Sequence, residues 1–302
     1  MRPGFAQLRV LDMDEAIEHY VERLGLDLVS KEDDGRVYLK CFDEFGRHSI
    51  VLRETDQAGI DVFAFKAEND DAMDGFRKRI EDWGLEVDEV PAGEMPGTGR
   101  RIGFTIPSGH RIEIFGEMEL SDMAPETVNP HIWKGEPPRG MKAQRLDHCL
   151  LYGPNLAETQ QFLIEALDFH VPELVKLPDG EPFAIWATVS NKAHDIAFVA
   201  HEEPGKLHHI AFFLQDWAEI GHAADIITQY NLSLDLGPTR HGITRGQTIY
   251  FFDPSGNRNE VFSGGYTAYK DHPQRTWDME NVGRGIFYYE RKLNDAFLSV
   301  VS

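Results

Sequence analysis

The feature that most constrains the fold is a repeat inside the chain. Residues 104–115 read FTIPSGHRIEIF and residues 251–262 read FFDPSGNRNEVF, and the glutamates of the two segments are 260 − 113 = 147 residues apart. Each segment predicts a strand, a tight turn and a second strand, because Pro presets φ and Gly accepts a positive φ. An internal duplication of this size decides the architecture before any single element does.

Each half contains two smaller units with the same plan of a strand, a helix and further strands. In the first unit the apolar residues Ala16, Tyr20 and Leu24 share one helical face, Asp12 is the predicted N-cap, and Gly25 ends the helix. The second unit predicts a helix over 72–83, the third a helix entered at Asn155, and the fourth a helix over 217–229. Strands are expected at 5–11, 26–30, 37–42, 49–52, 61–65, 85–90, 101–104, 111–115, 145–152, 183–189, 195–199, 207–213 and 248–262.

We therefore expect an α+β fold of four βαβββ modules, paired into two domains that are each a curved, mixed-sheet half-barrel pair. The expected limits are 1–117 for an N-terminal domain, 118–143 for a connector rich in Pro and Gly, 144–263 for a C-terminal domain, and 264–302 for an aromatic tail that packs on it.

Charge and composition exclude some partners. The 302 residues include 30 basic and 51 acidic ones, for a net charge of −21, so phosphate repels the chain and neither nucleic acid nor an anionic membrane is an expected partner. The N-terminus lacks an apolar signal region, no run of about eighteen apolar residues occurs, and two cysteines are too few for a disulfide framework. We expect a cytoplasmic protein.

One carboxylate stands out in the second repeat. Strand alternation turns Glu260 toward the face of a half-buried sheet, where a carboxylate is costly unless it is paired or binds a metal. Nine of the thirteen histidines follow residue 143, and His148 and His209 each lie within the first strand of a unit. Two imidazoles and one carboxylate form the facial triad of non-haem iron sites. Strand alternation alone does not choose between His209 and its neighbour His208.

The duplication makes this set specific to one half. Counting along the repeats matches Gln7 with His148, Asp61 or Val62 with His209, and Glu113 with Glu260. The first half thus keeps the carboxylate and lacks both imidazoles, and we expect it to bind no metal. We expect the active site in the C-terminal domain, which makes 144–263 the catalytic domain.

At this point the chain resembles the catechol 2,3-dioxygenase family of type I extradiol enzymes, in the vicinal oxygen chelate superfamily. The resemblance rests on the segments around Asp147-His148 and Leu207-His209, and on KAHD at 192–195, GPTRHG at 237–242, and YFFDPSGNRNEVF at 250–262. It covers nearly the whole chain. The segment around Glu260 is its most specific part.

The resemblance implies a site and a reaction. It implies Fe(II) held by His148, His209 and Glu260, with the second histidine of the pair as the ligand, although these ligands would also suit Mn(II). It implies extradiol cleavage of catechol or alkyl- and halo-catechols by O₂ to 2-hydroxymuconic semialdehyde, in the degradation of aromatic compounds, by a homotetramer. The residues implied for catalysis are His194 as acid/base with His241 and Tyr250 as hydrogen-bonding groups, and those for the pocket around the ring are Trp186, Ile243, Ile286 and Phe297.

Two other classes of function fit the same fold. A module that only sequesters a ligand has no need for His194, His241 and Tyr250 beside a complete triad. A metal-dependent isomerase or lyase usually completes a four-ligand set across more than one pair of modules, and the matching positions of the first half are mostly not ligands. The sequence leaves the preferred ring substituents open.

Overall fold

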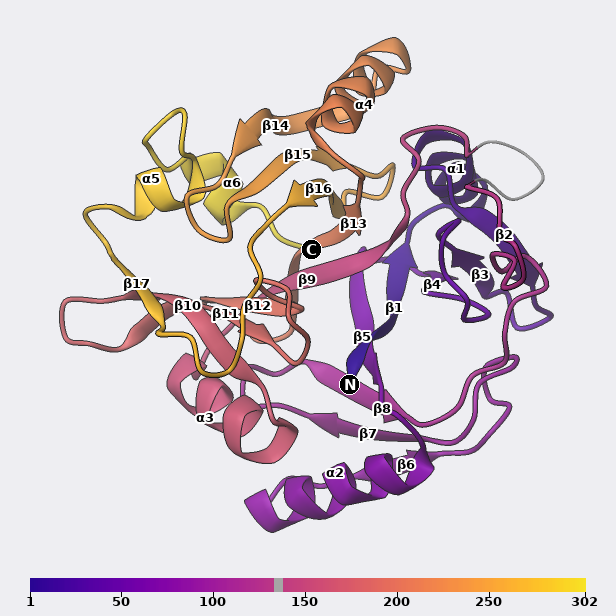
Figure 1. Ribbon diagram of the computed structural model, residues 1–302, viewed down its shortest axis with the longest axis horizontal. Coiled ribbons are helices and arrows are strands. Elements are labelled where there is room, and N and C mark those ends of the chain that lie inside the picture. The colour runs from indigo at the N-terminus through magenta and orange to yellow at the C-terminus, as the bar shows by residue number, and fades with distance from the viewer. Residues whose placement is uncertain (133–137) are drawn as a thin grey trace.

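The computed structural model describes residues 1–132 and 138–302, so residues 133–137 of the predicted connector lie outside the described residues. Two sheets make up the architecture, one from each half of the chain (Figure 1). Helices lie on the outer sides of the sheets, and the sequence repeat appears as four βαβββ modules. The expected α+β fold with two domains is confirmed.

The first sheet has eight strands in the order β2-β3-β4-β1-β5-β8-β7-β6. Its central strands β1 and β5 are antiparallel, while β4 and β8 run parallel to them on either side, so two modules meet at the middle of the sheet. The elements are β1 (Arg2–Val10), α1 (Met13–Ile17), the π-helical η1 (Glu18–Arg23), β2 (Asp27–Lys31), β3 (Val37–Lys40), β4 (Ile50–Glu54), β5 (Gly59–Lys66), α2 (Asp70–Trp83), β6 (Asp88–Val90), β7 (Arg101–Thr105) and β8 (Arg111–Phe115).

The second sheet repeats this plan and adds one strand, in the order β14-β15-β16-β13-β9-β12-β11-β10-β17. The added strand β17 comes from the tail and runs parallel to β10. The elements are β9 (Arg145–Gly153), α3 (Leu156–Leu167), β10 (His170–Lys176), β11 (Pro182–Thr188), β12 (Ile196–Ala200), β13 (Lys206–Phe213), α4 (Trp217–Gln229), β14 (Ser233–Arg240), β15 (Gly246–Phe252), β16 (Arg258–Gly264), β17 (Arg275–Asp278), α5 (Val282–Ile286) and α6 (Asp295–Ser299).

The helix ends test the predicted caps. Asp12 accepts a hydrogen bond from the backbone N–H of Glu15, and Gly25 has a φ of 89°, as the sequence predicts. Asn155 does not cap α3, because its backbone is left-handed and its side chain donates to the carbonyl of Pro107 in the other half of the chain. The predicted start of the helix at Asn155 is confirmed, but its side chain makes a contact across the two sheets instead of a cap.

The apolar sides of the helices and sheets form one core that joins the halves, and ring contacts between Phe65 and Phe169 and between Trp83 and Phe162 cross from one half to the other. Among the described residues, none of the helices combines the length and the apolar character needed to cross a membrane. The limits given above for the domains, connector and tail stay predictions.

Candidate active site

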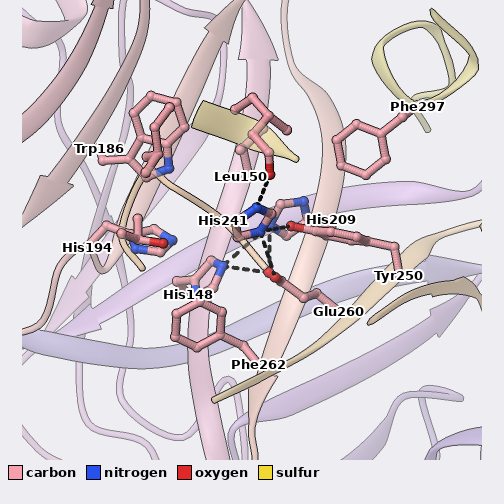
Figure 2. Close-up of a pocket in the computed structure, with 13 residues that line it drawn as sticks. His148, Leu150, Trp186, His194, His209, His241, Tyr250, Glu260, Phe262 and Phe297 are labelled. Carbon is pink, nitrogen blue, oxygen red and sulfur yellow. Dashed lines mark hydrogen bonds and ion pairs between the residues drawn. The ribbon is translucent and has the colours of Figure 1, made fainter. Parts of the chain in front are cut away.

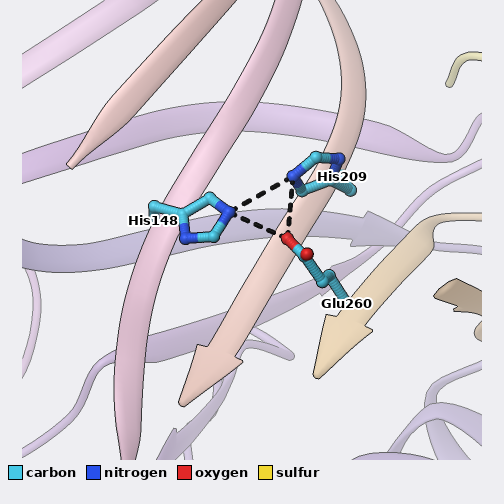
Figure 3. A group of neighbouring side chains, drawn as sticks. All are labelled: His148, His209 and Glu260. Carbon is cyan, nitrogen blue, oxygen red and sulfur yellow. Dashed lines mark hydrogen bonds and ion pairs between the residues drawn. The ribbon is translucent and has the colours of Figure 1, made fainter. Parts of the chain in front are cut away.

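Three neighbouring strands place His148, His209 and Glu260. Ala211 on β13 pairs with Glu260 on β16 to one side and with His148 on β9 to the other. Residues that are paired across strands share a face of the sheet. His209 lies two positions before Ala211 on the same strand, so its side chain is on this face as well. The three polar side chains therefore meet on one face of the sheet (Figure 3), the face that the pairing also assigns to Ala211.

The distances within this group suit a metal. Nε2 of His148 lies 2.8 Å from Oε2 of Glu260, Nε2 of His209 lies 3.1 Å from the same oxygen, and the two nitrogens are 3.4 Å apart. Ligands that bind at about 2.1 Å and at right angles to one another are about 3.0 Å apart. All three side chains are buried, so the spacing is that of three ligands on one side of an ion.

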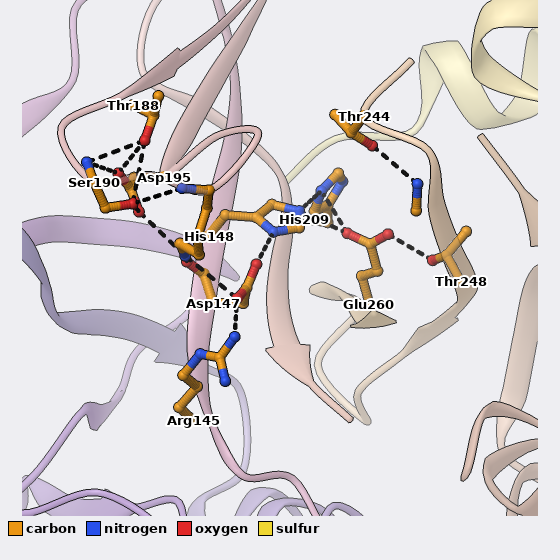
Figure 4. A network of polar contacts seen from close by, with 12 residues as sticks. Arg145, Asp147, His148, Thr188, Ser190, Asp195, His209, Thr244, Thr248 and Glu260 are labelled. Atoms are coloured by element: carbon orange, nitrogen blue, oxygen red, sulfur yellow. Dashed lines mark hydrogen bonds and ion pairs between the residues drawn. The ribbon is translucent and has the colours of Figure 1, made fainter. Parts of the chain in front are cut away.

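Asp147 determines which nitrogen of His148 faces the group. Its Oδ2 lies 2.9 Å from Nδ1 of His148 (Figure 4). Although burial raises the pKa of a carboxyl group, Lys192 and His148 hold the pKa of Asp147 well below its usual value. An ionised carboxylate only accepts hydrogen bonds, so Nδ1 of His148 carries a proton, and Nε2 is the nitrogen that faces Glu260. Burial by itself would lower the pKa of His148, but Glu260 and Asp147 raise it.

A second chain of contacts does the same for His209. The carbonyl oxygen of Phe297 lies 2.9 Å from Nε2 of His208, and Nδ1 of His208 lies 2.8 Å from Nδ1 of His209. A carbonyl only accepts, and burial lowers the pKa of His208 well below its usual value, so the neutral ring donates from Nε2 and accepts at Nδ1. His209 therefore donates from Nδ1 and presents the lone pair of Nε2. His208 and His209 thus have different positions, and only His209 faces Glu260.

Glu260 is ionised, and its two carboxylate oxygens have different partners. The hydroxyl of Thr248 donates to Oε1 at 2.5 Å, which leaves Oε2 directed at the two imidazoles (Figure 4). Burial by itself would raise the pKa of Glu260, but His209 and His148 hold it well below its usual value. Burial lowers the pKa of His209 to about 4, so this imidazole is neutral at pH 7.

The donor set fits a divalent cation. Two imidazole nitrogens and one carboxylate oxygen converge within 3.4 Å of one another, and a divalent cation that displaces the proton on Nε2 of His148 would join all three. Hydrogen bonds to the outer nitrogens are the arrangement that fixes metal-ligating histidines. Two imidazoles with one carboxylate are typical of non-haem iron sites.

His194 lies against this group on the side of Trp186, whereas Tyr250 lies on the opposite side (Figure 2). The ring centroids of His194 and His148 are 3.9 Å apart. Burial, and next the charge of His148, lower the pKa of His194 well below its usual value. A neutral imidazole beside the metal group can take up or supply a proton.

Several polar contacts to the carboxylate of Asp195 hold the loop before His194 in place. Its carboxylate accepts from the hydroxyl of Thr188 at 2.7 Å and from the backbone N–H of Ser190 at 3.0 Å, and the ammonium of Lys192 lies 3.1 Å from it (Figure 4). These contacts fix the loop between β11 and β12, and with it the position of His194.

His241 and Tyr250 form a pair across the site from His194. Nδ1 of His241 contacts the carbonyl oxygen of Ile286, and Nε2 lies 2.9 Å from the hydroxyl of Tyr250. Nδ1 therefore donates and Nε2 accepts, which makes Tyr250 the donor. Burial raises the pKa of Tyr250 well above its usual value, so its hydroxyl keeps its proton at neutral pH.

The ten residues predicted for the site line one cavity (Figure 2). Its volume is about 40 Å³, far below the roughly 300–1,000 Å³ of pockets that hold drug-sized ligands, so an aromatic ring enters only if lining side chains move. The sequence reasoning missed Leu150, Phe262 and Thr244. Leu150 and Phe262 lie two residues after His148 and Glu260, and strand alternation could have found them. No sequence signal points to Thr244.

The N-terminal sheet has the same row of residues paired across three strands, with other side chains in it. Ala64 on β5 pairs with Phe5 on β1 and with Glu113 on β8, as Ala211 pairs with His148 and Glu260. The counterpart of His148 is therefore Phe5, and Gln7 was the wrong match. Val62, two positions before Ala64, is the counterpart of His209.

Around Glu113 the partners are arginines. Nε of Arg101 lies 2.8 Å from its carboxylate and Nη2 of Arg111 lies 3.1 Å from it. Register places Arg101 where the second sheet has Thr248. By the same comparison His48 corresponds to His194, since both lie two residues before the strand residues that pair with Ala6 and Cys149.

Comparisons with known proteins agree with this geometry. Residues 60–119 match the family model of the catechol 2,3-dioxygenase-like N-terminal domain, and residues 145–261 match that of the glyoxalase/bleomycin resistance protein/dioxygenase superfamily. Metapyrocatechase of Pseudomonas sp. (strain CF600) is 45% identical over 303 residues, which cover 100% of this chain and 98% of that protein. The manganese-dependent 2,3-dihydroxybiphenyl 1,2-dioxygenase of Geobacillus genomosp. 3 is 28% identical, with 95% of this chain and 92% of that protein covered.

A solved structure is similar over nearly the same length. The 2,3-dioxygenase LapB from Pseudomonas sp. KL28 superposes with a TM-score of 0.90 at 45% identity, covering 93% of this chain and 98% of that one. The two-sheet fold, the buried group of two histidines and a glutamate, and the full-length identity lead to one assignment: the chain belongs to the metapyrocatechase family of extradiol dioxygenases.

Proposed function

We propose that this extradiol dioxygenase cleaves catechol, or alkyl- and halo-catechols, beside the two hydroxyl groups and forms 2-hydroxymuconic semialdehyde. Both atoms of O₂ enter the product. The observation that carries the proposal is the convergence of His148, His209 and Glu260, each oriented by a hydrogen bond to a neighbour, in a chain 45% identical to a metapyrocatechase.

We assign Fe(II) to the site. The two imidazoles and the carboxylate would hold the ion on one side and leave adjacent positions open. The bound ion would supply a Lewis-acidic centre that lowers the pKa of the catechol hydroxyls and gathers the two reactants. The manganese dependence of one relative makes Mn(II) the alternative.

His194 is assigned the proton transfers. Its neutral ring takes a proton from a catechol hydroxyl and returns it when the ring carbon bond breaks, because its buried position keeps it from being protonated by solvent. The contact of its ring with His148, and the hydrogen bonds of the neighbouring Asp195, keep it at a fixed distance from the reacting oxygens.

His241 and Tyr250 orient the reactants from the other side. The hydroxyl of Tyr250 already shares a hydrogen bond with His241, so the pair offers a donor that a developing negative charge on oxygen can attract. The side chains of Trp186, Ile243 and Phe297 supply apolar walls that exclude water.

The proposal is tested by aerobic addition of catechol to the Fe(II)-loaded protein. We expect the yellow ring-cleavage product, and His148→Ala should lose both bound iron and activity. A colourless reaction with iron bound would overturn the function. Iron content and activity that persist in His148→Ala would overturn the ligand assignment.

The quaternary structure and location are part of the proposal. We infer a homotetramer in the cytoplasm, with the domain limits given above. Size-exclusion chromatography with light scattering measures the assembly, and a mass other than four chains would contradict it.

A further inference from the structure

A second pocket adjoins the catalytic cavity from outside. It has a volume of about 600 Å³ and shares His241 with the cavity as a wall residue. Four arginines from four different segments line it: Arg240 at the end of β14, Arg245 before β15, Arg275 on β17, and Arg284 on α5. We call it the arginine pocket.

These four cations have no anionic partner in the described part of the chain. Across residues 1–132 and 138–302, no ion pair of 4.0 Å or less joins any of them to a carboxylate. Arg275 and Arg245 instead lie over the ring of Tyr266, at 3.8 Å and 5.8 Å from its centroid. Most other arginines of the chain do pair with acidic residues, as Arg100 does with Asp74.

Two carboxylates also line the arginine pocket, and Glu173 is the buried one. It accepts hydrogen bonds from the backbone N–H of Thr244 at 2.8 Å, the hydroxyl of Tyr266 at 2.8 Å and the indole N–H of Trp277 at 2.7 Å. Its oxygens are therefore engaged by neutral donors, and they hold the tail against the loop that follows His241.

Asp278 is the other carboxylate. It accepts from the backbone N–H of Asn281 at 2.8 Å and from the side-chain amide of Asn281 at 2.9 Å. Four guanidinium groups against two engaged carboxylates leave the pocket with an excess of two positive charges. In a chain with a net charge of −21, a concave surface of this sign concentrates anions.

The segments 241–243 and 284–286 supply lining residues to both pockets. The backbone N–H groups of Gly242 and Ile243 both donate to the carbonyl oxygen of Gly285 at 2.8 Å. A Cβ on Gly242 would lie 2.8 Å from the carbonyl oxygen of Arg284, so the two segments touch there. A molecule in the arginine pocket is thus separated from the metal group by His241 and this pair of backbone segments.

We propose that the arginine pocket binds the carboxylate of a small organic anion that is entering or leaving the catalytic cavity. The source of the anion rests on the proposed function. Ring cleavage adds O₂ to catechol, breaks one ring carbon bond, and leaves one carboxyl group and one aldehyde, and the carboxyl group is ionised at neutral pH. A carboxylate on a ring substituent has the same chemistry, and guanidinium groups match it with paired hydrogen bonds.

Binding is measured without turnover. The probe is 3,4-dimethoxyphenylacetate, which carries the carboxylate and whose methylated oxygens cannot be cleaved as a diol, and its methyl ester is the neutral control. Isothermal titration of the full-length protein should show the acid binding and the ester not binding. The double variant Arg240→Gln/Arg284→Gln should bind the acid about tenfold or more weakly, because each hydrogen bond to a charged group contributes a factor of roughly 10 to 100 to the affinity.

The matched control is Lys31→Gln/Lys78→Gln, which removes the same charge from exposed positions of the N-terminal half. It should leave the affinity for the acid unchanged. Absence of acid binding in the wild type, or equal binding of acid and ester, would overturn the proposal. Because this assay needs no catalysis, acid binding that depends on the arginines stands even if catechol is not cleaved.

Kinetics separates the two sources of the anion. If the anion is a substituent, Arg240→Gln/Arg284→Gln raises KM for 3,4-dihydroxyphenylacetate and not for 4-methylcatechol. If it is the product, the variant raises the product inhibition constant and leaves both KM values unchanged. A variant that changes neither, but alters the oligomeric mass, would instead show that the arginines face a second copy of the chain.

Discussion

His208 offers a direct test of how the metal group is arranged. His208→Phe keeps a flat aromatic ring at this position, so the new side chain can still stack on Tyr152, whose ring centroid is 4.7 Å from that of His208. Two buried groups lose their partners: the carbonyl of Phe297 and Nδ1–H of His209. Each unpaired group costs about 1–3 kcal/mol, or about 2–6 kcal/mol together, and the change also frees His209 to turn its proton toward the metal.

We expect His208→Phe to bind Fe(II) about 10- to 100-fold more weakly, as is usual when the partner of a metal-ligating histidine is removed. In His208→Asn the amide oxygen can still accept from His209, so most of the affinity should remain. Fe(II) affinity is measured by competition with a chelator, and stability by urea unfolding. The exposed change His222→Phe on α4 is the control. Wild-type iron affinity in a folded His208→Phe protein would refute the reasoning.

Three further changes test the row of paired residues. Ala211→Leu puts a larger side chain on the face that carries the three donors, and the folded protein should contain no iron by metal analysis; a full complement of iron would contradict the register. His194→Phe should keep its iron and lose about 10²- to 10⁴-fold in kcat, so an unchanged rate would remove its role. Glu113→Ala breaks a buried ion pair with Arg101, which keeps its second ion pair with Glu94. The loss of unfolding free energy should therefore stay below the roughly 3–5 kcal/mol of a buried charge without any partner, while the iron content stays at the wild-type level; loss of iron would show that the N-terminal half contributes to the site.

Much of the site could be predicted from the sequence because the strands are regular there. Alternation and the repeat pointed to Glu260, and the places of His148 and His209 in the first strands of their units made them candidates. The resemblance then selected these two and supplied the other predicted residues of the cavity, but not Leu150, Phe262 and Thr244. The four-module plan followed from the repeat itself, since each copy must bury the same apolar faces.

The misses have physical causes. Gln7 was matched with His148 because counting along the chain ignores insertions in loops, which are tolerated there, and only the pairing of Phe5 with Ala64 fixes the register. The strand β17 is only four residues long with a single apolar residue, Trp277, which is too short for a periodic pattern to be recognised, and it pairs with β10. The function of His208 depends on the carbonyl of Phe297, 89 residues away, which no local pattern reveals.

The matched rows of the two sheets also have a consequence for engineering. The backbone that supports the metal group exists twice, with Phe5 and Val62 in the places of the histidines and Glu113 already present. Replacing both by histidine would still leave the guanidinium of Arg101 on the carboxylate, so the change to Thr found in the other sheet is needed as well. Arg111 also lies 3.1 Å from this carboxylate, so a second metal centre needs these three substitutions and the removal of Arg111 as well. In the N-terminal sheet, two arginines thus neutralise the carboxylate that the other sheet offers to its histidines.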